Sequence, residues 1–478
     1  MTWARTILVL DLPSILTILM KEKLDPIKDL FPYDAFRPSQ DRFIKECHES
    51  LDKPRHVVIS APNGFGKTVS TLCAAIPVAL ENDLKIVYCC RTHTQNSRVI
   101  MELNKIFQKL DKEGKDIKSL YHLGGVSLRS RTDMCFMDQV LKANLNPSDA
   151  SIVCGQLRAD NRCKFFRNMK WALGKDDLHL PVSTNSSFDA GDIKDYCSMK
   201  NYCPYFYSRE LQKKVLVIVA NYNWVFDPDI QERFLDVINV PLEEILLIID
   251  EAHNLPPLAE RIYSRKLGDY TISAATRELG EYFHRDSDKD ELKSFLRLIQ
   301  DLFDEYEDRI GNQDEMDLDG RKIIQDLQHG LNQDLGILFH HLDETGKEIQ
   351  KEKLASGKRN PRSFCRAVAK FWREWYLYTL DKASYYHCFS LNRDSATLRH
   401  NFEAVCLDPG LTGIQHVMER VFASVSLSGT IIPNVYSTQC RINQPVTIEL
   451  PSPFKENHVK AFILDGVSTA FKDRDESM

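Results

Sequence analysis

The sequence predicts an α/β protein that is built on a parallel sheet and carries a phosphate-binding loop. Short runs rich in Val, Ile and Leu recur along the chain, and each is followed by a loop and usually by a helical pattern. A glycine-containing loop that ends in Lys-Thr follows the first of these runs. Continuous apolar runs of this length are typical of strands that are buried on both faces of a parallel sheet.

The composition is that of a globular protein with a substantial core. The 478 residues are enough for about three domains. Apolar residues make up 43% and charged residues 27% of the chain, which excludes collagen-like, disordered and small disulfide-rich classes. The net charge of −6 means that any contact with nucleic acid would come from local basic patches. The 13 cysteines read as reduced thiols, so we expect a cytoplasmic or nuclear protein.

The amino-terminal region contains one apolar stretch, residues 7–20, which Asp11 and Pro13 interrupt. It is shorter than the roughly 20 residues that a membrane span needs. No small-residue cleavage site follows it. We therefore expect an ordinary helix here, with no signal peptide and no membrane contact.

Five strands are expected, and two long segments of different character separate them. The first segment, about residues 121–207, is rich in cysteine, and the second, about 256–401, reads as long helices. Within the second, residues 281–320 hold 14 acidic and 5 basic side chains, which favours a solvated helical face and an exposed loop. The expected strands are residues 56–60, 85–90, 215–220, 245–249 and 423–427.

The loop after the first strand has the P-loop pattern, with alanine in place of the first glycine. Small residues let the backbone turn so that successive N–H groups face a phosphate, at the positive end of the helix expected over residues 69–80. Lys67 is expected to reach the β- and γ-phosphates, and Thr68 to bind Mg²⁺. The loop residues, all expected to contact the nucleotide, are Ala61, Pro62, Asn63, Gly64, Phe65, Gly66, Lys67 and Thr68.

A P-loop requires an acidic partner at the end of another buried strand. The strand at 245–249 is followed by Asp250, Glu251, Ala252 and His253. Asp250 is expected to hold Mg²⁺ through its water shell, and Glu251 to orient the attacking water. An Asp-Glu pair alone is a weak signal, but five apolar residues before it and a matching P-loop make it a strong one.

Together with the P-loop, the Asp-Glu-Ala-His string resembles the XPD-like helicases of superfamily 2, the group that includes XPD, FANCJ and DinG. Further stretches in the same order extend the resemblance over nearly the whole chain. They are Phe36-Arg37-Pro38-Ser39-Gln40, Arg91-Thr92-His93-Thr94-Gln95, Asn221-Tyr222-Asn223-Trp224, Cys406-Leu407-Asp408-Pro409 and Leu427-Ser428-Gly429-Thr430.

The resemblance implies an ATP-dependent DNA helicase that moves 5′ to 3′ and acts in DNA repair or in transcription-linked duplex opening. It implies that Arg37 and Gln40 contact adenine, and that the Ser-Gly-Thr segment couples nucleotide state to DNA binding. The catalytic residues implied are Lys67, Asp250, Glu251 and His253. The expected contacts with single-stranded DNA are Arg91, Thr92 and Gln95, to which the nearby basic residues Arg129 and Arg131 are added.

Four cysteines of the first long segment form a candidate metal site. Cys135, Cys154, Cys163 and Cys203 are separated by 18, 8 and 39 residues, with no C-x₂-C pair. Four thiolates can hold zinc or an iron–sulfur cluster, and the spacing does not choose between them. The resemblance implies a 4Fe-4S cluster. Cys197 is a rival for the fourth position, and the Cys-Pro-Tyr-Phe string favours Cys203.

The resemblance also implies the domain organisation. Residues 1–115, 208–255 and 402–435 are expected to form one discontinuous RecA-like motor domain. Residues 116–207 would be the iron–sulfur insertion and residues 256–401 a helical arch domain. Residues 436–478 would begin a second RecA-like domain, most of which this sequence lacks.

The missing second domain leaves two hypotheses for function. The chain is either a helicase subunit that uses ATP and Mg²⁺ on single-stranded DNA or a forked duplex, or a module that binds ATP and single-stranded DNA without translocating. A fragment, a split gene whose partner chain supplies the second RecA-like domain, and a degenerate copy all remain open.

Overall fold

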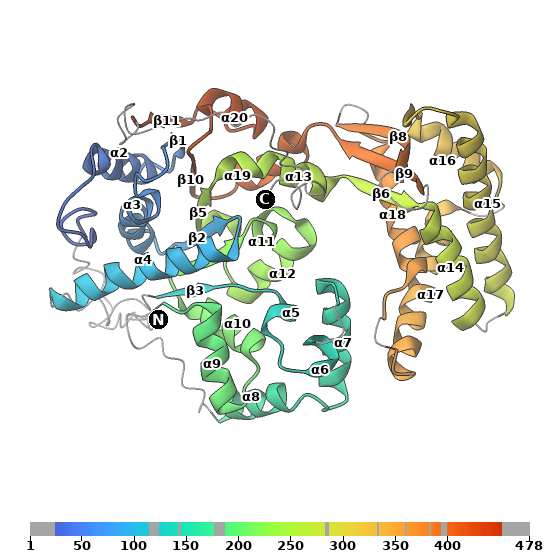
Figure 1. Ribbon diagram of the computed structural model, residues 1–478, viewed down its shortest axis with the longest axis horizontal. Helices are drawn as coiled ribbons and strands as arrows, with labels where there is room; N and C mark the ends of the chain where they lie inside the picture. The colour runs from blue at the N-terminus through green and yellow to red at the C-terminus, as the bar shows by residue number, and fades with distance from the viewer. Residues whose placement is uncertain are drawn as a thin grey trace, which may run out of the picture.

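The computed structural model describes residues 24–113, 124–141, 145–175, 187–282, 286–331, 334–358, 361–381, 384–392 and 399–451. The helix expected over residues 7–20 lies outside these ranges. No helix within them is both long and apolar enough to cross a membrane. The chain forms a main α/β body, and two insertions extend from it (Figure 1).

The main body is built on a parallel sheet of seven strands, as the sequence predicts. Their order across the sheet is β11-β1-β10-β5-β2-β4-β3. The apolar runs form central strands, and their ends agree with the prediction to within two residues. The strands are β1 (His56–Ser60), β2 (Lys85–Cys90), β3 (Gly125–Ser127), β4 (Val217–Asn221), β5 (Ile245–Asp250), β10 (Ala423–Ser428) and β11 (Val446–Glu449).

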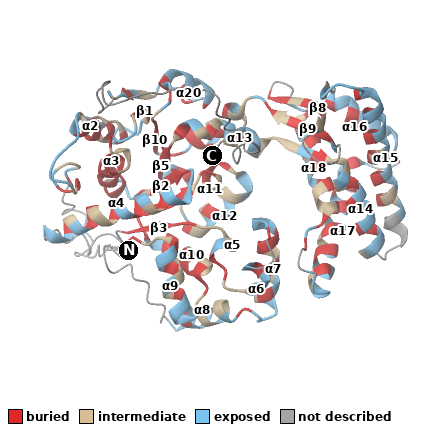
Figure 2. Ribbon diagram, in the orientation of Figure 1, coloured by how far each residue is buried: buried red, intermediate tan, exposed pale blue. Residues whose placement is uncertain are grey.

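Helices cover both faces of this sheet, and its central strands are buried (Figure 2). This explains why these strands are apolar throughout. Leu246 and Ile248 of β5 face one apolar cluster, and Leu247 and Ile249 face another. The first cluster is covered by α2 (Gln40–Leu51), α3 (Lys67–Glu81) and α4 (His93–Lys112). The second is covered by α11 (Asn223–Phe226), α12 (Pro228–Ile238), α13 (Leu255–Tyr263), α19 (Gln415–Met418) and α20 (Pro433–Gln439).

The first insertion leaves the sheet after β3 and returns at β4. It consists of short helices around a small apolar cluster of its own. Because β3 pairs with β4, the chain up to residue 127 belongs to the main sheet, beyond the predicted boundary at 115. The helices are α5 (Arg131–Met134), α6 (Asp138–Leu141), α7 (Pro147–Ala159), α8 (Lys164–Gly174), α9 (Ala190–Lys200) and α10 (Pro204–Lys214).

The second insertion combines helices with a sheet that the sequence did not predict. Its helices are α14 (Asp269–Tyr282), α15 (Asp286–Ile310), α16 (Gly320–His329), α17 (Leu335–Ala355) and α18 (Phe364–Tyr378). Its antiparallel strands lie in the order β6 (Arg265–Gly268), β9 (Arg399–Cys406), β8 (Tyr385–Asn392) and β7 (Glu315–Asp317). Phe389 and Phe402 of the sheet pack with Trp372 and Trp375 of α18, so the sheet helps to build the core of this insertion.

The carboxyl-terminal described segment differs from the sequence expectation. Residues 436–478 were expected to begin a second RecA-like domain. Instead, β11 pairs in parallel with β1 and extends the main sheet at its edge. The chain up to Glu449 therefore contributes to the main sheet, and residues 452–478 lie outside the described part of the chain.

Candidate functional site: a nucleotide cradle and a cysteine-lined cavity

The P-loop lies at the carboxyl end of β1, where the chain turns into α3. Gly64 and Gly66 have φ angles of 82° and 89°, in the left-handed region that glycine tolerates best. A Cβ atom at Gly66 would come within 2.5 Å of the Gln40 side-chain nitrogen. The P-loop therefore requires glycine at position 66, both for its backbone conformation and because a side chain there would collide with Gln40.

Lys67 is held over the loop by contacts with both sides of the predicted site. Its Nζ donates to the Ala61 carbonyl at 3.2 Å and to Asn63 Oδ1 at 3.3 Å, and lies 3.8 Å from Glu251 Oε1. Together with Thr68 it stands at the start of α3, where the positive end of the helix favours phosphate. Lys67 thus contacts both parts of the predicted nucleotide site, the P-loop and the Asp-Glu pair.

Asp250 is the last residue of β5, and Glu251 follows it. β5 pairs with β10, which in turn pairs with β1, the strand that leads into the P-loop. Asp250 is buried, and its Oδ1 accepts a hydrogen bond from the Glu251 backbone N–H at 3.0 Å. Burial, followed by the charge of Glu251, raises the pKa of Asp250 to about 6. A cation at this position would favour the ionised form of the carboxyl.

His253 connects the Asp-Glu-Ala-His string to the Ser-Gly-Thr segment. Its Nδ1 lies 2.7 Å from Ser428 Oγ and 3.5 Å from Glu251 Oε2. Ser428 also donates to Glu251 Oε2 at 3.4 Å and accepts from the Thr430 backbone N–H at 3.2 Å. Because β5 and β10 are neighbours in the sheet, they bring Glu251, His253 and Ser428 together where we expect the attacking water.

Tyr222 is a supporting residue to which the sequence analysis gave no role. Its hydroxyl donates to the backbone carbonyl of Asp250 and, at 3.2 Å, to that of Glu251. Glu251 has a φ angle of 52°, so the chain turns sharply at this point. The tyrosine fixes that turn. Two sequence signals pointed to it: its stretch belongs to the family resemblance, and it directly follows β4, which ends at the same edge of the sheet as the other parallel strands.

The predicted adenine contacts line a cavity beside the P-loop. Gln40 is buried, donates to Ser70 Oγ at 2.9 Å and accepts from the Arg37 backbone N–H at 3.0 Å. The Arg37 guanidinium donates to the Gly64 carbonyl. The cavity has a volume of about 420 Å³. Its lining residues are Phe31, Tyr33, Ala35, Arg37, Gln40, Gly66, Thr68, Val69, Arg98, Met101 and Glu102. Of these, Arg37, Gln40, Gly66 and Thr68 were predicted as nucleotide contacts, and the others, including those on α4, were not.

The five predicted DNA contacts fall into two groups. Arg91, Thr92 and Gln95 are at the end of β2, where Thr92 and Gln95 form a capping box at the start of α4. Arg129 is largely covered, donates to the His93 carbonyl at 3.3 Å and lies 3.7 Å from Asp189 Oδ1. Arg131 lies 4.5 Å from the Tyr205 ring centroid and has a buried Nε without a partner among the described residues. The structure thus engages both arginines in contacts with the first insertion.

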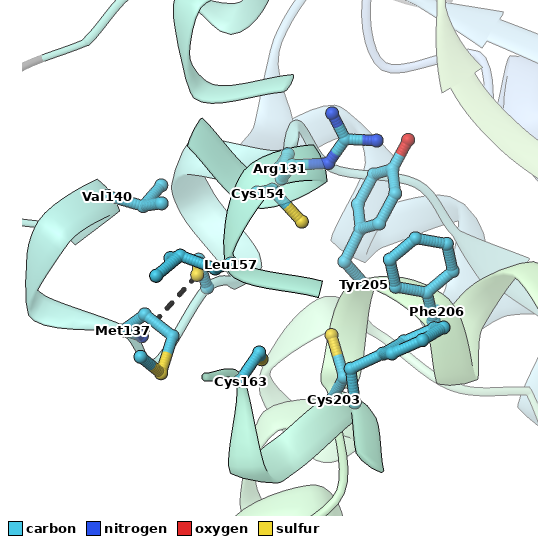
Figure 3. Close-up of a pocket in the computed structure, with 11 residues that line it drawn as sticks. Arg131, Met137, Val140, Cys154, Leu157, Cys163, Cys203, Tyr205 and Phe206 are labelled. Atoms are coloured by element: carbon cyan, nitrogen blue, oxygen red, sulfur yellow. Dashed lines mark hydrogen bonds between the residues drawn. The ribbon is translucent and has the colours of Figure 1, made fainter. Parts of the chain in front are cut away.

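The four predicted cysteines line one cavity in the first insertion. Four helices position them: Cys135 follows α5, Cys154 lies within α7, and Cys163 and Cys203 directly precede α8 and α10. Figure 3 shows Cys154, Cys163 and Cys203 around this cavity. Cys163 and Cys203 hold the N-cap positions of their helices without capping them through the side chain.

The rival Cys197 is fully buried and does not line this cavity. Burial raises the pKa of Cys135 to about 11 and that of Cys203 to about 12, and the neighbouring thiols contribute further. These thiols are therefore neutral at pH 7 unless a cation offsets their negative charge.

The chemistry of the donor set fits a 4Fe-4S cluster. Such a cluster takes four thiolate ligands, and the four predicted cysteines line one cavity. Four thiolates are also a ligand set for zinc, so the residues alone do not choose between the two.

Comparisons with known proteins point to one group. The DEAD_2 family model matches residues 88–272. The general transcription and DNA repair factor IIH helicase subunit XPD/RAD3 of Saccharomyces cerevisiae is 27% identical over 303 residues, which are 60% of this chain and 37% of that protein. A regulator of telomere elongation helicase 1 homologue of Arabidopsis thaliana is 23% identical, over 93% of this chain and 47% of that protein. The chain thus spans less than half the length of these relatives.

Two solved structures share the fold. One named XPD_Helicase has a TM-score of 0.53 at 19% identity and covers 87% of this chain and 62% of its own. One named Truncated XPD has a TM-score of 0.51 at 17% identity and covers 86% of this chain and 99% of its own. These findings confirm the predicted resemblance: the chain is similar in sequence to XPD/RAD3 and similar in fold to the solved XPD structures.

Proposed function

We propose that the chain is the ATP- and DNA-binding part of a 5′ to 3′ DNA helicase that acts in repair or in transcription-linked duplex opening. The observation that carries this proposal is the position of Lys67 between the P-loop and Glu251, beside the buried Asp250. P-loop backbone groups, a lysine, a magnesium-binding aspartate and a water-orienting glutamate are the parts that phosphoryl transfer requires.

Each part has a role in the proposed reaction. The P-loop and Lys67 bind the β- and γ-phosphates, while Thr68 and Asp250 hold Mg²⁺. Glu251 orients the water that attacks the γ-phosphate. The contact of His253 with Ser428 would transmit the nucleotide state towards the DNA-binding residues Arg91, Thr92 and Gln95, which also lie at the carboxyl edge of the sheet.

The four cysteines Cys135, Cys154, Cys163 and Cys203 are proposed to hold a 4Fe-4S cluster. When bound, the cluster would supply a rigid cross-link among four helices. Such a link would support a small apolar cluster, because two of the seven buried residues described around the cavity are the cysteines Cys135 and Cys163 themselves. The alternative function, a module that binds ATP and single-stranded DNA without translocating, is favoured by the single RecA-like sheet among the described residues.

Nucleotide binding tests the proposal most directly. We expect the purified chain to bind a fluorescent ATP analogue in a Mg²⁺-dependent manner, and Lys67→Ala to weaken that binding at least about tenfold, since a charge-assisted contact contributes about 1.5–3 kcal/mol. The matched control is Lys53→Ala, which removes an exposed lysine after α2. Equal affinity of the wild-type chain and Lys67→Ala would refute a functional P-loop.

A further inference from the structure

We infer that four charged side chains at the base of the second insertion form an ionic latch, which holds this insertion close to the main body and opens at low cost. The latch consists of Asp229 of α12, Lys370 and Glu374 of α18, and Arg265 at the start of β6. The inference does not depend on the nucleotide or DNA roles proposed above. It concerns how the second insertion is held relative to the sheet that carries the candidate nucleotide site.

The second insertion is joined to the main body through two paired strands. In Figure 1, β6 leads from α13 into the insertion, and β9 leads back. Arg265 of β6 is paired with Ala404 of β9, and the Cys406 backbone N–H donates to Ser264 Oγ at 2.9 Å. Two adjacent strands form a narrow base. A few residues at such a base can absorb the change in φ and ψ when one domain turns against another.

The apolar cores of the two parts are separate. The core of the second insertion is built from residues between Leu267 and Ala404. Within the described ranges, no residue of this insertion belongs to either apolar cluster of the main body. Leu354 of α17, which is partly buried, packs against the small cluster of the first insertion. Relative motion is the default expectation for two domains without a large apolar interface, so polar contacts decide how closely they approach.

Arg265 and Glu374 form the fixed part of the latch. Arg265 Nε and Nη2 donate to the two carboxylate oxygens of Glu374, the second at 3.3 Å. Nη1 donates to the carbonyl of Ile262 and, at 2.9 Å, to that of Ser264, at the end of α13. A bidentate pair of arginine and carboxylate has a defined geometry. It therefore attaches α18 to the end of α13 and provides a pivot for the insertion.

Asp229 and Lys370 form the part of the latch that can break. Lys370 Nζ donates to Asp229 Oδ2 at 2.9 Å, across the boundary between α18 and α12. The side chains of Lys370 and Asp229 are 45% and 68% exposed. An exposed ion pair shifts an equilibrium by a factor of about five at most, and salt weakens it. The hydrogen bond from Lys370 lowers the pKa of Asp229, so this pair is charged at neutral pH.

Each partner of the breakable pair has another charge nearby. Lys370 Nζ lies 3.8 Å from Glu374 Oε1, four residues along α18. When the contact with Asp229 breaks, the lysine keeps this acidic neighbour, which offsets part of the lost attraction. Asp229 keeps the positive charges of Arg233 and Arg265 in its surroundings. The pair is therefore suited to opening and closing rather than to permanent attachment.

The test measures the distance between the main body and the second insertion in the purified chain. Spin labels are attached to azidophenylalanine at the exposed positions Glu419 and Lys351, which avoids the 13 native cysteines, and double electron–electron resonance gives the distance distribution. We expect one dominant distance and a minor second one. Asp229→Asn and Lys370→Gln should each raise the minor population relative to the dominant one about two- to fivefold.

Two further measurements separate the latch from a passive surface contact. The double variant of Asp229→Asn and Lys370→Gln should resemble each single variant, because both substitutions remove the same contact. About 1 M NaCl should change the wild-type distribution in the same direction and have little effect on the variants, because the Debye length is then about 3 Å. Lys370→Arg should keep the wild-type distribution.

The matched control is Lys266→Gln. It removes an ion pair with Glu403 that lies within the sheet of the second insertion and in which the lysine is similarly exposed. Its distance distribution should be that of the wild-type chain. Circular dichroism and ATP-analogue binding should be unchanged in all variants. Distances that stay the same in Asp229→Asn, in Lys370→Gln and at high salt would overturn the inference, and so would an equally large change in Lys266→Gln.

Discussion

At the candidate nucleotide site, the pKa of a single side chain depends on the residues around it. The Asp250 carboxyl is an example, because the strand that positions it also buries it. Its pKa of about 6 lies within an accessible pH range. A proton on this carboxyl competes with Mg²⁺, because only the carboxylate binds the cation well. We therefore expect the binding of Mg²⁺ at Asp250 to depend on pH.

We expect the Mg²⁺-dependent part of ATP-analogue binding to weaken about tenfold between pH 7 and pH 5. With a pKa near 6, the carboxyl is mostly ionised at the upper pH and mostly protonated at the lower one, so affinity falls as the pH falls. Titrations at several pH values with and without Mg²⁺ measure this. Asp250→Asn should lose the Mg²⁺-dependent part and respond to pH only through the nucleotide. Parallel pH curves for the two proteins would contradict the assignment.

The sequence was informative about residues whose chemistry is local and less so about those whose partners are distant in the chain. The P-loop is contiguous, so its glycines and Lys67 could be recognised directly. Arg129 was predicted as a DNA contact from its charge alone. In the folded chain it approaches Asp189, 60 residues further along, through an insertion whose path no local pattern specifies. The role of Tyr222 likewise depends on pairing between strands.

At the scale of elements, apolar runs predicted strands well wherever both faces of a strand are covered. The strands β1, β2 and β5 are such cases. In contrast, β8 and β9 bury polar residues such as His387, His400 and Asn401, so no continuous apolar run marks them as strands, and the sequence was interpreted as long helices. The edge strand β11 has only four residues and one buried side chain, which is too little signal to separate it from a new domain.

The first insertion yields a prediction about its cysteines. We expect anaerobically purified chain to contain about four irons. We expect Cys203→Ser to lose most of this iron and Cys197→Ser to keep it, since Cys203 lines the cavity with three other thiols and Cys197 does not. Iron and zinc analysis of the three proteins measures the difference. Bound zinc without iron, or retention of iron in Cys203→Ser and not in Cys197→Ser, would show that the cluster or its fourth ligand is wrongly assigned.

At the scale of the whole molecule, the described residues combine one RecA-like sheet with two insertions at its sides. The nucleotide cradle and the predicted DNA contacts Arg91, Thr92 and Gln95 lie at the carboxyl edge of that sheet. The seven-stranded sheet is the one parallel sheet that the described residues form. Nucleotide binding needs one such sheet, whereas fast hydrolysis in two-domain motors needs a second domain as well, so we predict that the two activities can be measured separately.

We expect the 478-residue polypeptide to bind Mg-ATP and single-stranded DNA, and to show little DNA-stimulated ATP hydrolysis and no strand separation. An arginine finger accelerates phosphoryl transfer by 10³–10⁵, or about 4–7 kcal/mol, and in two-domain motors the opposite domain supplies it. Unwinding depends even more on that domain, because translocation requires two domains that close and open around the nucleotide.

The measurement is ATPase activity with and without oligothymidylate, together with unwinding of a forked duplex. Both should be repeated after a second RecA-like domain from an XPD-like helicase is fused to the chain or added in trans. That addition should raise hydrolysis in the wild-type chain and leave Glu251→Gln inactive, because Glu251 must still orient the water. Rapid DNA-stimulated hydrolysis by the polypeptide alone, abolished by Lys67→Ala, would show that a group within these 478 residues already stabilises the transition state.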